Sequence, residues 1–285
     1  MSSNSVGMTV GAHRRRARPW NLYIGAALIS IVIMMAVVSF IWLPHDPAHV
    51  QVLNRFESPS ANHWLGTDHL GRDVFSRILV GARTVILVGF LAVAVGVTVG
   101  VIVGSVAAFA GGWTDELLMR VMDALGAYPP VLAALLLASI FGPGTATGTV
   151  AIGIATVPVF ARLVRSNILT LREAEFVEAA KALGAGSRRI ITQHMWPNTA
   201  GLILVQATVT FGQAVLAEAA LSYLGLGTQP PAPSWGRMLR DAQDFLFFSA
   251  YPAVFPGIAI ALTVLGLNLL GDGLRDQIDP RHRGS

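Results

Sequence analysis

The chain has 285 residues, of which 53% are hydrophobic and 13% charged, and its mean hydropathy is +0.60. This balance excludes an ordinary soluble domain and indicates an integral membrane protein. The net charge of +4 comes from basic residues spread over short loops without interleaved aromatic residues, which argues against nucleic acid as a partner. The absence of cysteine excludes disulfides, thiolate metal sites and a cysteine nucleophile.

Uncharged stretches long enough to cross a bilayer predict six transmembrane helices and an all-α membrane protein. The stretch from 124 to 161 is too long for one crossing and contains Gly-Pro-Gly directly after Phe141, so it predicts a hairpin of two helices. The expected spans are 20–43, 84–114, 117–141, 147–164, 197–217 and 245–271.

Lys and Arg gather on one side of these predicted spans. They precede the first span, occur near the start of the third at Arg120, fill the loop after the fourth and recur in the C-terminal tail. Because short loops rich in Lys and Arg remain in the cytoplasm, both termini and the loop before the fifth span are expected there. No small-residue cleavage site follows the first span closely, so we expect this span to remain as an anchor.

A polar island, FVEAAKALGAGSRRIITQHMWP, separates the predicted fourth and fifth spans. The small residues Ala179 and Ala180 beside Glu178 would let a short helix approach a partner closely. Gly184 permits the positive φ that ends such a helix, and Ser187 can cap the next one. The pattern predicts a helix-turn-helix docking surface, although an ordinary amphipathic surface helix carries the same triplet.

The second span repeats small residues every four positions, at Ala92, Gly96, Gly100, Gly104 and Ala108. This spacing places them on one helix face, where two helices in lipid can approach closely. We therefore predict a packing face, directed either within the chain or toward a partner subunit.

Two further features inside the spans suggest a translocation path. Tyr128 precedes two prolines in the third span, which predicts a kink that is either a hinge or a static bend. Glu218 is an acid flanked by long uncharged runs, and an ionisable group at membrane depth usually faces a cavity or a partner. The alternative places Glu218 at the outer interface, in contact with solvent.

The segment between the first two spans contains His63 and His69 near Asp68 and Asp73, a combination that could bind a metal ion. Nothing in the spacing places these side chains on one face, and the apolar residues that follow favour an amphipathic helix starting near Asp73. We therefore predict no metal site, and a segment that packs on the membrane surface or on a partner.

Four motifs together resemble a known family. Glu-Ala-Ala followed by glycine four residues later resembles the EAA loop of ABC importer permeases. NHWLGTDHLGRDVFSRILVGART, EAALSYLGLGTQPPAPSWGRML and LGDGLRDQIDPR occur in the order found in C-type permease subunits of dipeptide and oligopeptide ABC importers. The resemblance covers residues 20–281, with one departure at Trp196, where the family often has leucine.

The resemblance implies a type I importer fold with a basic tail (1–19), a first span (20–43), an extracytoplasmic segment (44–83), a permease core (84–272) and a second tail (273–285). The EAA loop, within 165–196, would couple the core to ATP hydrolysis.

The implied partners are a homologous B-type permease, two ATPase subunits, an extracytoplasmic binding protein and the lipid of a bacterial plasma membrane. The chain lacks a phosphate-binding G-x-x-x-x-G-K-[ST] loop, so ATP and Mg²⁺ would bind to the ATPase subunits and this chain would hold no cofactor and catalyse no reaction.

Several alternatives remain for the transported solute and the class of protein. The same family also carries nickel, glutathione and other small solutes. A stand-alone secondary transporter or channel would need several intramembrane ionisable groups or inverted repeats, which the sequence does not show. The motifs of intramembrane serine and metal proteases are also missing.

Overall fold

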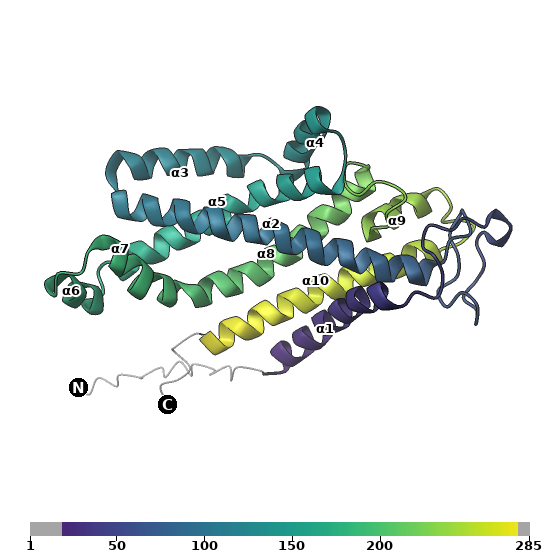
Figure 1. Cartoon of the computed structure of the whole chain (residues 1–285), viewed down its shortest axis with the longest axis horizontal. Coiled ribbons are helices and arrows are strands. Elements are labelled where there is room, and N and C mark those ends of the chain that lie inside the picture. Colours follow the sequence, from purple (N-terminus) through teal and green to yellow (C-terminus); the bar gives the residue numbers. More distant parts are fainter. Residues whose placement is uncertain (1–18, 279–285) are drawn as a thin grey trace, which may run out of the picture.

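A computed structural model describes residues 19–278, which form an elongated bundle of helices (Figure 1). Within this range the only β-type pairing is an isolated bridge between Thr67 and Asp73. The α-helices are α1 (Pro19–Ile41), α2 (Val74–Ala110), α3 (Gly112–Ala127), α4 (Pro130–Phe141), α5 (Thr145–Leu171), α6 (Glu175–Ala182), α7 (Ser187–Ile190), α8 (Trp196–Leu224), α9 (Trp235–Gln243) and α10 (Tyr251–Ile278). A short 3-10 turn, η1 (Val52–Asn54), and a π-helical turn, η2 (Ile191–Met195), complete them.

Five of these helices, α1, α2, α5, α8 and α10, are each long and apolar enough to cross a membrane. The pair α3 and α4 passes the same test together and supplies a sixth crossing, although the two helices are bent by 86°. The predicted all-α architecture with six spans is therefore confirmed when the bent pair counts as one span.

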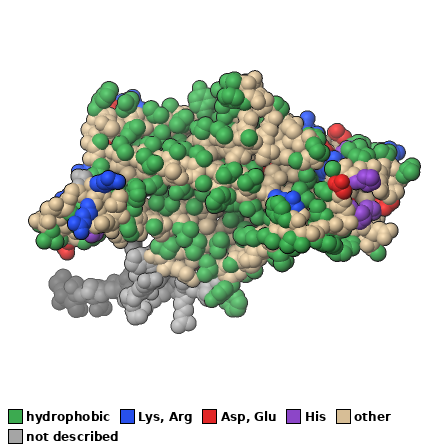
Figure 2. Space-filling view, viewed as in Figure 1, with side chains coloured by type: hydrophobic (Ala, Val, Ile, Leu, Met, Phe, Trp, Pro, Cys, Tyr) green, Lys and Arg blue, Asp and Glu red, His purple; other side chains and the backbone are tan. Residues whose placement is uncertain are grey.

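The surface has the distribution of side chains that a bilayer requires. Figure 2 shows hydrophobic side chains over the middle of this face, whereas most of the charged and histidine side chains lie toward the two ends. One end carries α6 and α7, and the other carries the irregular segment between α1 and α2 (Figure 1). The N-terminal end of α1 and the C-terminal end of α10 point toward the end with α6 and α7.

Helix α2 is longer at its start than the sequence predicts, and it is continuous. It begins at Val74, ten residues before the predicted span at 84, and ends at Ala110 rather than 114. The Asp73 carboxylate caps it by accepting a hydrogen bond from the Ser76 N–H, at 2.7 Å. The predicted helix start near Asp73 is therefore confirmed, but this helix is not separate from the second span, because its residues form the first turns of the span itself.

The predicted small-residue face of α2 lies against α5. A Cβ atom added at Gly100 would stand 2.6 Å from the Phe160 Cβ and 2.9 Å from the Val157 carbonyl oxygen. The faces at Gly96 and Gly104 are equally crowded, by Thr156 and Ala161 of α5 respectively. The two helices therefore touch backbone to backbone along a seam within one chain.

The third crossing is broken in its middle. Tyr128 is extended, as expected for a residue before proline, and Pro129 and Pro130 begin α4 at an 86° angle to α3. The predicted third span starts at 117, whereas α3 begins at Gly112. The Tyr128 side chain is exposed on the surface of the chain.

The remaining spans differ from the prediction at their ends. Helix α5 continues past 164 to Leu171, and α8 continues past 217 to Leu224. Helix α10 starts at Tyr251 rather than at 245, because residues 245–248 form turns after α9. The predicted coupling loop at 165–196 therefore begins inside α5.

Candidate functional site

The loop between α5 and α8 folds as the sequence predicts for a docking surface, with a short helix, a tight turn and a second helix. Gly184 has φ +80° and follows α6. Its N–H donates to the Lys181 carbonyl at 2.9 Å, and the Ala185 N–H donates to the Ala180 carbonyl at 3.0 Å. These two bonds form a Schellman motif, which satisfies the last carbonyls of α6 and reverses the chain.

Helix α6 has an inner apolar face and an outer exposed face. Val177 and Ala180 are buried in a cluster of apolar residues from α2, α5 and α7. Glu178 and Ala179 are exposed, and Leu183 at the C-cap is 89% exposed. The sequence interpretation gave both alanines to a partner surface. Only Ala179 lies there, because Ala180 falls on the side of the helix that packs on the bundle.

Polar contacts fix this loop to the long helices. The Arg172 guanidinium, directly after α5, donates to the Ala108 carbonyl of α2 at 2.7 Å. Arg165 of α5 makes two hydrogen bonds of 2.5 Å to the carboxylate of Asp115 of α3. A bidentate arginine-carboxylate pair restricts both distance and orientation. Arg172 therefore ties the start of the loop to α2, and the Arg165–Asp115 pair ties α5, from which the loop continues, to α3.

The second half of the loop runs through η2 into α8. The Trp196 indole N–H donates to the Ser105 hydroxyl of α2 at 3.0 Å, so the residue that departs from the family pattern ties α8 to α2. Helix α7 begins at Ser187. The predicted cap by the Ser187 side chain lies outside the described side chains.

Glu218 is only 3% exposed and lies near the end of α8. Its Oε1 accepts hydrogen bonds from Ser222 at 2.7 Å and Thr228 at 3.5 Å, while Oε2 finds no partner among the described residues. This burial contradicts the alternative that places Glu218 in contact with solvent at the outer interface, because the chain after α8 folds back over it. The carboxylate instead lines a small internal cavity with Thr145 and Thr228, and its role in a translocation path stays a prediction.

At the opposite end, residues 44–73 and 225–250 fold together into what we name the polar cap. Asp68 and Asp241 lie between three arginines there. Arg72 contacts Asp68 at 2.7 Å and Asp241 at 3.3 Å, Arg77 reaches each carboxylate at 3.7 Å, and Arg237 donates to Asp241 at 2.9 Å. The network joins the segment before α2 to α9, although these elements are far apart in the sequence.

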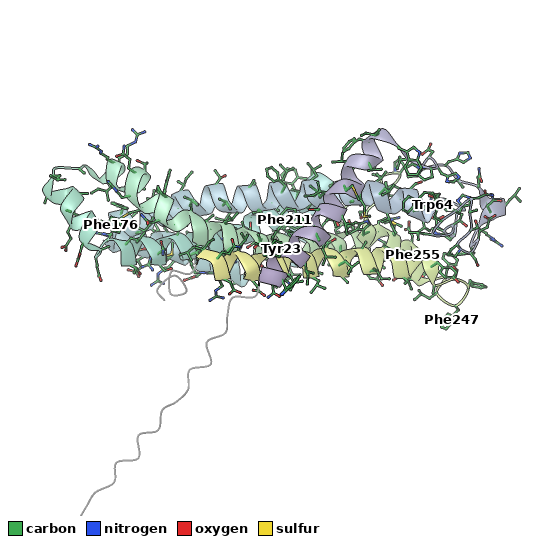
Figure 3. The ribbon with its side chains drawn as sticks, turned by 90° about the horizontal axis from the view of Figure 1, so that it is seen from below. Tyr23, Trp64, Phe176, Phe211, Phe247 and Phe255 are labelled. Atoms are coloured by element: carbon green, nitrogen blue, oxygen red, sulfur yellow. The ribbon has the colours of Figure 1, made fainter. Side chains whose placement is uncertain are left out.

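Aromatic side chains complete the polar cap. The buried Trp235 indole donates to the Ile78 carbonyl at 3.0 Å and packs on Gly81 of α2. Phe245 stacks on His69 at 5.2 Å between ring centroids. Figure 3 shows Trp64 and Phe247 at this end and Phe176 of α6 at the far end.

The two histidines that the sequence singled out lie in different surroundings. His69 packs on Phe245, and burial lowers its pKa below the ordinary value of 6.5. His63 instead hydrogen-bonds to Asp73 and lies beside His45. His45 was missed, since it stands 18 positions before His63 with no recognisable spacing between them.

The long apolar helices, the bent third crossing and the helix-turn-helix loop together define a polytopic transport permease. Residues 96–284 match the family described as "Binding-protein-dependent transport system inner membrane component". The chain belongs to this family.

Two curated relatives cover nearly the whole chain. The dipeptide transport system permease protein DppC of Alkalihalophilus pseudofirmus is 44% identical over 258 residues, which is 90% of this chain and 85% of the relative. The glutathione transport system permease protein GsiD of Escherichia coli O6:K15:H31 is 42% identical over 272 residues, 95% of this chain and 90% of the relative. Family and relatives make this chain a multi-pass membrane permease subunit of an ABC importer.

A solved structure has the same fold. An inward-facing structure of the MetNI methionine ABC transporter superposes with a TM-score of 0.56 at 18% identity, over 69% of this chain and 91% of that one. The type I importer fold that the sequence motifs imply is therefore confirmed.

Proposed function

We propose that this chain forms half of the translocation pathway of a peptide ABC importer, and that the α6–α7 loop receives the movement of a partner ATPase. The exposed face of Glu178, Ala179 and Leu183 carries the proposal. An 89% exposed leucine beside a tight turn buries little surface in its own chain, and it suits a socket on a partner.

The packing of the loop suggests how its movement reaches the membrane. Only residues 172–174 separate α5 from α6, and the inner face of α6 packs on α2 and α5. Since α2 and α5 also share the glycine seam, a push on α6 would displace the two spans together as a rigid unit. If this displacement rotates the two spans against the partner permease, the pathway would open in turn to each side of the membrane.

The proposed positions of the other subunits assume that the α6–α7 loop faces the cytoplasm and the polar cap faces the opposite side of the membrane. A related permease would complete the pathway, and the exposed surface around the α3–α4 bend, with Tyr128, is a candidate for facing it or the solute. Two ATPase subunits would hold ATP and Mg²⁺ beneath the α6–α7 loop, on the cytoplasmic side of a bacterial plasma membrane. A binding protein would dock at the polar cap.

The relatives support a peptide as the transported solute. The DppC relative is named for dipeptides, and the GsiD relative for glutathione, which is itself a small peptide. We take dipeptides or oligopeptides as the first candidate and glutathione as the second. Uptake of labelled dipeptide and of labelled glutathione by the same reconstituted complex would separate the two.

The coupling role can be tested by Leu183→Asp. This change places a charge on the exposed face while leaving the buried face of α6 intact, so the chain should insert and fold normally. The complex isolated from native membranes in mild detergent should lose its ATPase subunits but keep the partner permease. Leu53→Asp is the matched control, because Leu53 is 100% exposed in the polar cap at the opposite end.

Full retention of the ATPase subunits by the Leu183→Asp variant, together with normal uptake, would contradict the assignment of α6 as the coupling helix. Equal loss in the Leu53→Asp variant would show that general damage to the chain, rather than loss of a contact, causes the effect.

A further inference from the structure

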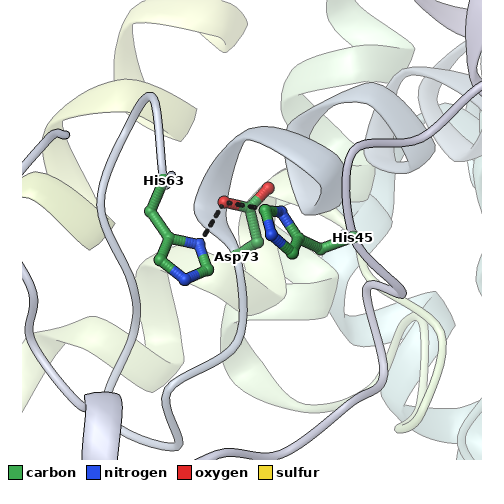
Figure 4. Close-up of side chains that lie close together, drawn as sticks. All are labelled: His45, His63 and Asp73. Atoms are coloured by element: carbon green, nitrogen blue, oxygen red, sulfur yellow. Dashed lines mark hydrogen bonds and ion pairs between the residues drawn. The ribbon is translucent and has the colours of Figure 1, made fainter. Parts of the chain in front are cut away.

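Three side chains converge where the segment after α1, the following loop and the start of α2 meet (Figure 4). The Nδ1 of His63 lies 2.9 Å from Oδ1 of Asp73, and the Nδ1 of His45 lies 3.8 Å from the same oxygen. The three candidate ligand atoms all lie within 4.8 Å of one another. Two imidazoles and one carboxylate form a donor set that zinc and related divalent ions bind.

The distances suit such an ion. Two ligands about 2.0–2.1 Å from a tetrahedral zinc stand roughly 3.4 Å apart. The separations of 2.9 and 3.8 Å lie on either side of this value, and the third pair of ligand atoms lies within 4.8 Å, so an ion would draw the two rings toward it. Three protein ligands leave the fourth position for water or another small ligand.

The ligands are oriented by a second layer of contacts, as in established metal sites. The other Asp73 oxygen accepts the Ser76 N–H at 2.7 Å, which leaves Oδ1 directed at the histidines. The Ser76 hydroxyl in turn accepts the backbone N–H of His45 at 3.2 Å. One buried serine therefore positions two of the three ligands.

One ligand atom has no other role in the structure. The Nδ1 of His45 is shielded from solvent and finds no hydrogen-bond partner among the described residues. A buried polar atom without a partner is unfavourable, and a bound ion would satisfy it. The side chains of Asp73 and His63 are 1% and 9% exposed, whereas that of His45 is 40% exposed, which leaves a route for the ion to enter.

We propose that His45, His63 and Asp73 bind one divalent transition-metal ion, with zinc as the best fit. This departs from the sequence prediction, which considered His63 with His69 and concluded that there is no metal site. For the ion to bind Nδ1 of His63, the proton of this neutral ring would move to Nε2 through solvent. The ion would then add metal bonds to three segments that hydrogen bonds already bring together. It fixes the segment between α1 and α2 to the first turn of α2, on the surface opposite the α6–α7 loop.

The test uses the full chain, purified in detergent with an affinity tag that contains no histidine and stripped with a chelator. Zn²⁺ is then titrated against a competing fluorescent chelator, and bound metal is counted by mass spectrometry. We expect one zinc per chain, with affinity at least about tenfold weaker in the His45→Ala and His63→Ala variants. His49→Ala is the matched control, because His49 is exposed in the same segment and outside the cluster.

A thermal unfolding measurement separates the effect of each variant on zinc binding from its effect on the stability of the chain. His45→Ala should unfold close to the wild type in chelator, since the His45 ring makes no hydrogen bond with the described residues and is 40% exposed. Only the wild type and His49→Ala should gain stability when Zn²⁺ is added. If no zinc is retained, or if His45→Ala binds it as tightly as the wild type, the proposal is wrong. A His63→Ala variant that misfolds leaves the decision to His45→Ala.

Discussion

The α6–α7 loop and the polar cap lie at opposite ends of the same long helices and are stabilised by different physical means. The loop is held mainly by small and apolar residues such as Val177 and Ala180, together with the hydrogen bond from Arg172 to the Ala108 carbonyl. The polar cap is held by a buried network in which Asp68 and Asp241 bridge Arg72 and Arg77. Apolar packing tolerates changes on the exposed side of α6, whereas a buried network of charges depends on every member.

This difference suits two different tasks. A loop that must follow a moving partner needs a rigid anchor and an exposed face that is free to bind. A cap that covers the ends of α2, α8 and α10 needs a single arrangement, and ion pairs with defined directions specify one. The predictions below test whether the two ends respond as differently as their contacts indicate.

The largest effect is expected for Asp68→Ala in the polar cap. Asp68 accepts hydrogen bonds from the Leu70 and Arg72 N–H groups and from the Arg72 side chain, at 2.7 to 3.0 Å. Removing it leaves buried arginine charge uncompensated, which should lower the free energy of unfolding by about 3–5 kcal/mol. Thermal unfolding of the purified chain measures this. Asp244→Ala, at an exposed position after α9, should change stability by less than about 0.5 kcal/mol.

A smaller loss of stability is expected for Gly100→Val, which lies on the seam between α2 and α5. The new side chain would overlap Phe160 and the Val157 carbonyl, forcing α2 and α5 apart at a cost of about 1–3 kcal/mol. Because the seam is proposed to transmit movement, uptake should fall further than stability does. Val99→Leu changes an exposed neighbour on α2 and serves as the control. Normal uptake by Gly100→Val would show that the seam between α2 and α5 does not transmit the movement that drives transport.

Gly184→Val should destabilise the α6–α7 loop by about 1–2 kcal/mol, because a valine at φ +80° strains the backbone. Apart from its neighbours in the chain, no atom of the described residues lies within 4 Å of the position that its Cβ would occupy, so steric overlap with them does not contribute. Insertion should be intact while ATP hydrolysis continues without uptake, as measured in proteoliposomes. Gly184→Asn should retain more coupling, because asparagine tolerates the left-handed conformation. Equal uptake by wild type and Gly184→Val would show that the turn geometry is not needed.

The smallest effect concerns pH at the polar cap. Burial is the main reason that the pKa of His69 lies below 6.5, with Arg72 and Arg77 acting in the same direction and Asp68 and Asp241 opposing them. The folded chain therefore favours neutral His69. Its contribution to stability is fully present above the unfolded value of 6.5 and is lost as pH falls through the lowered folded value.

Unfolding temperatures measured over this range should consequently fall less steeply with acid in His69→Gln than in the wild type. His49→Gln, at an exposed position of the same segment, should leave the slope unchanged. An identical slope in His69→Gln would assign the acid sensitivity of the polar cap to other groups.

Local patterns predicted the parts of the chain in which neighbours in sequence are also neighbours in space. The six crossings follow from runs of uncharged residues, and the turn after α6 follows from Gly184. The four-residue spacing that includes Gly100 likewise marks the seam on α2, since one helix face is a local property.

The remaining features depend on residues far apart in the chain. The start of α2 was placed too late because Arg77 and Arg83 read as the end of a loop, whereas Arg77 pairs with Asp241 and Arg83 stacks on Phe40. The approach of His45 to His63 and the burial of Glu218 likewise result from chain folding that no spacing reveals.

The unbroken course of α2 has a consequence for how this protein tolerates insertions. Its 37 residues run from the polar cap through the glycine seam to the neighbourhood of the α6–α7 loop. One residue inserted between Arg77 and Gly96 would advance everything beyond it by about 1.5 Å and turn it by about 100°. The arginine would then lose its carboxylates or the glycines would leave α5. We therefore expect no length changes between Arg77 and Gly96, because α2 fixes both the position of each of these residues along its axis and the direction in which each side chain points.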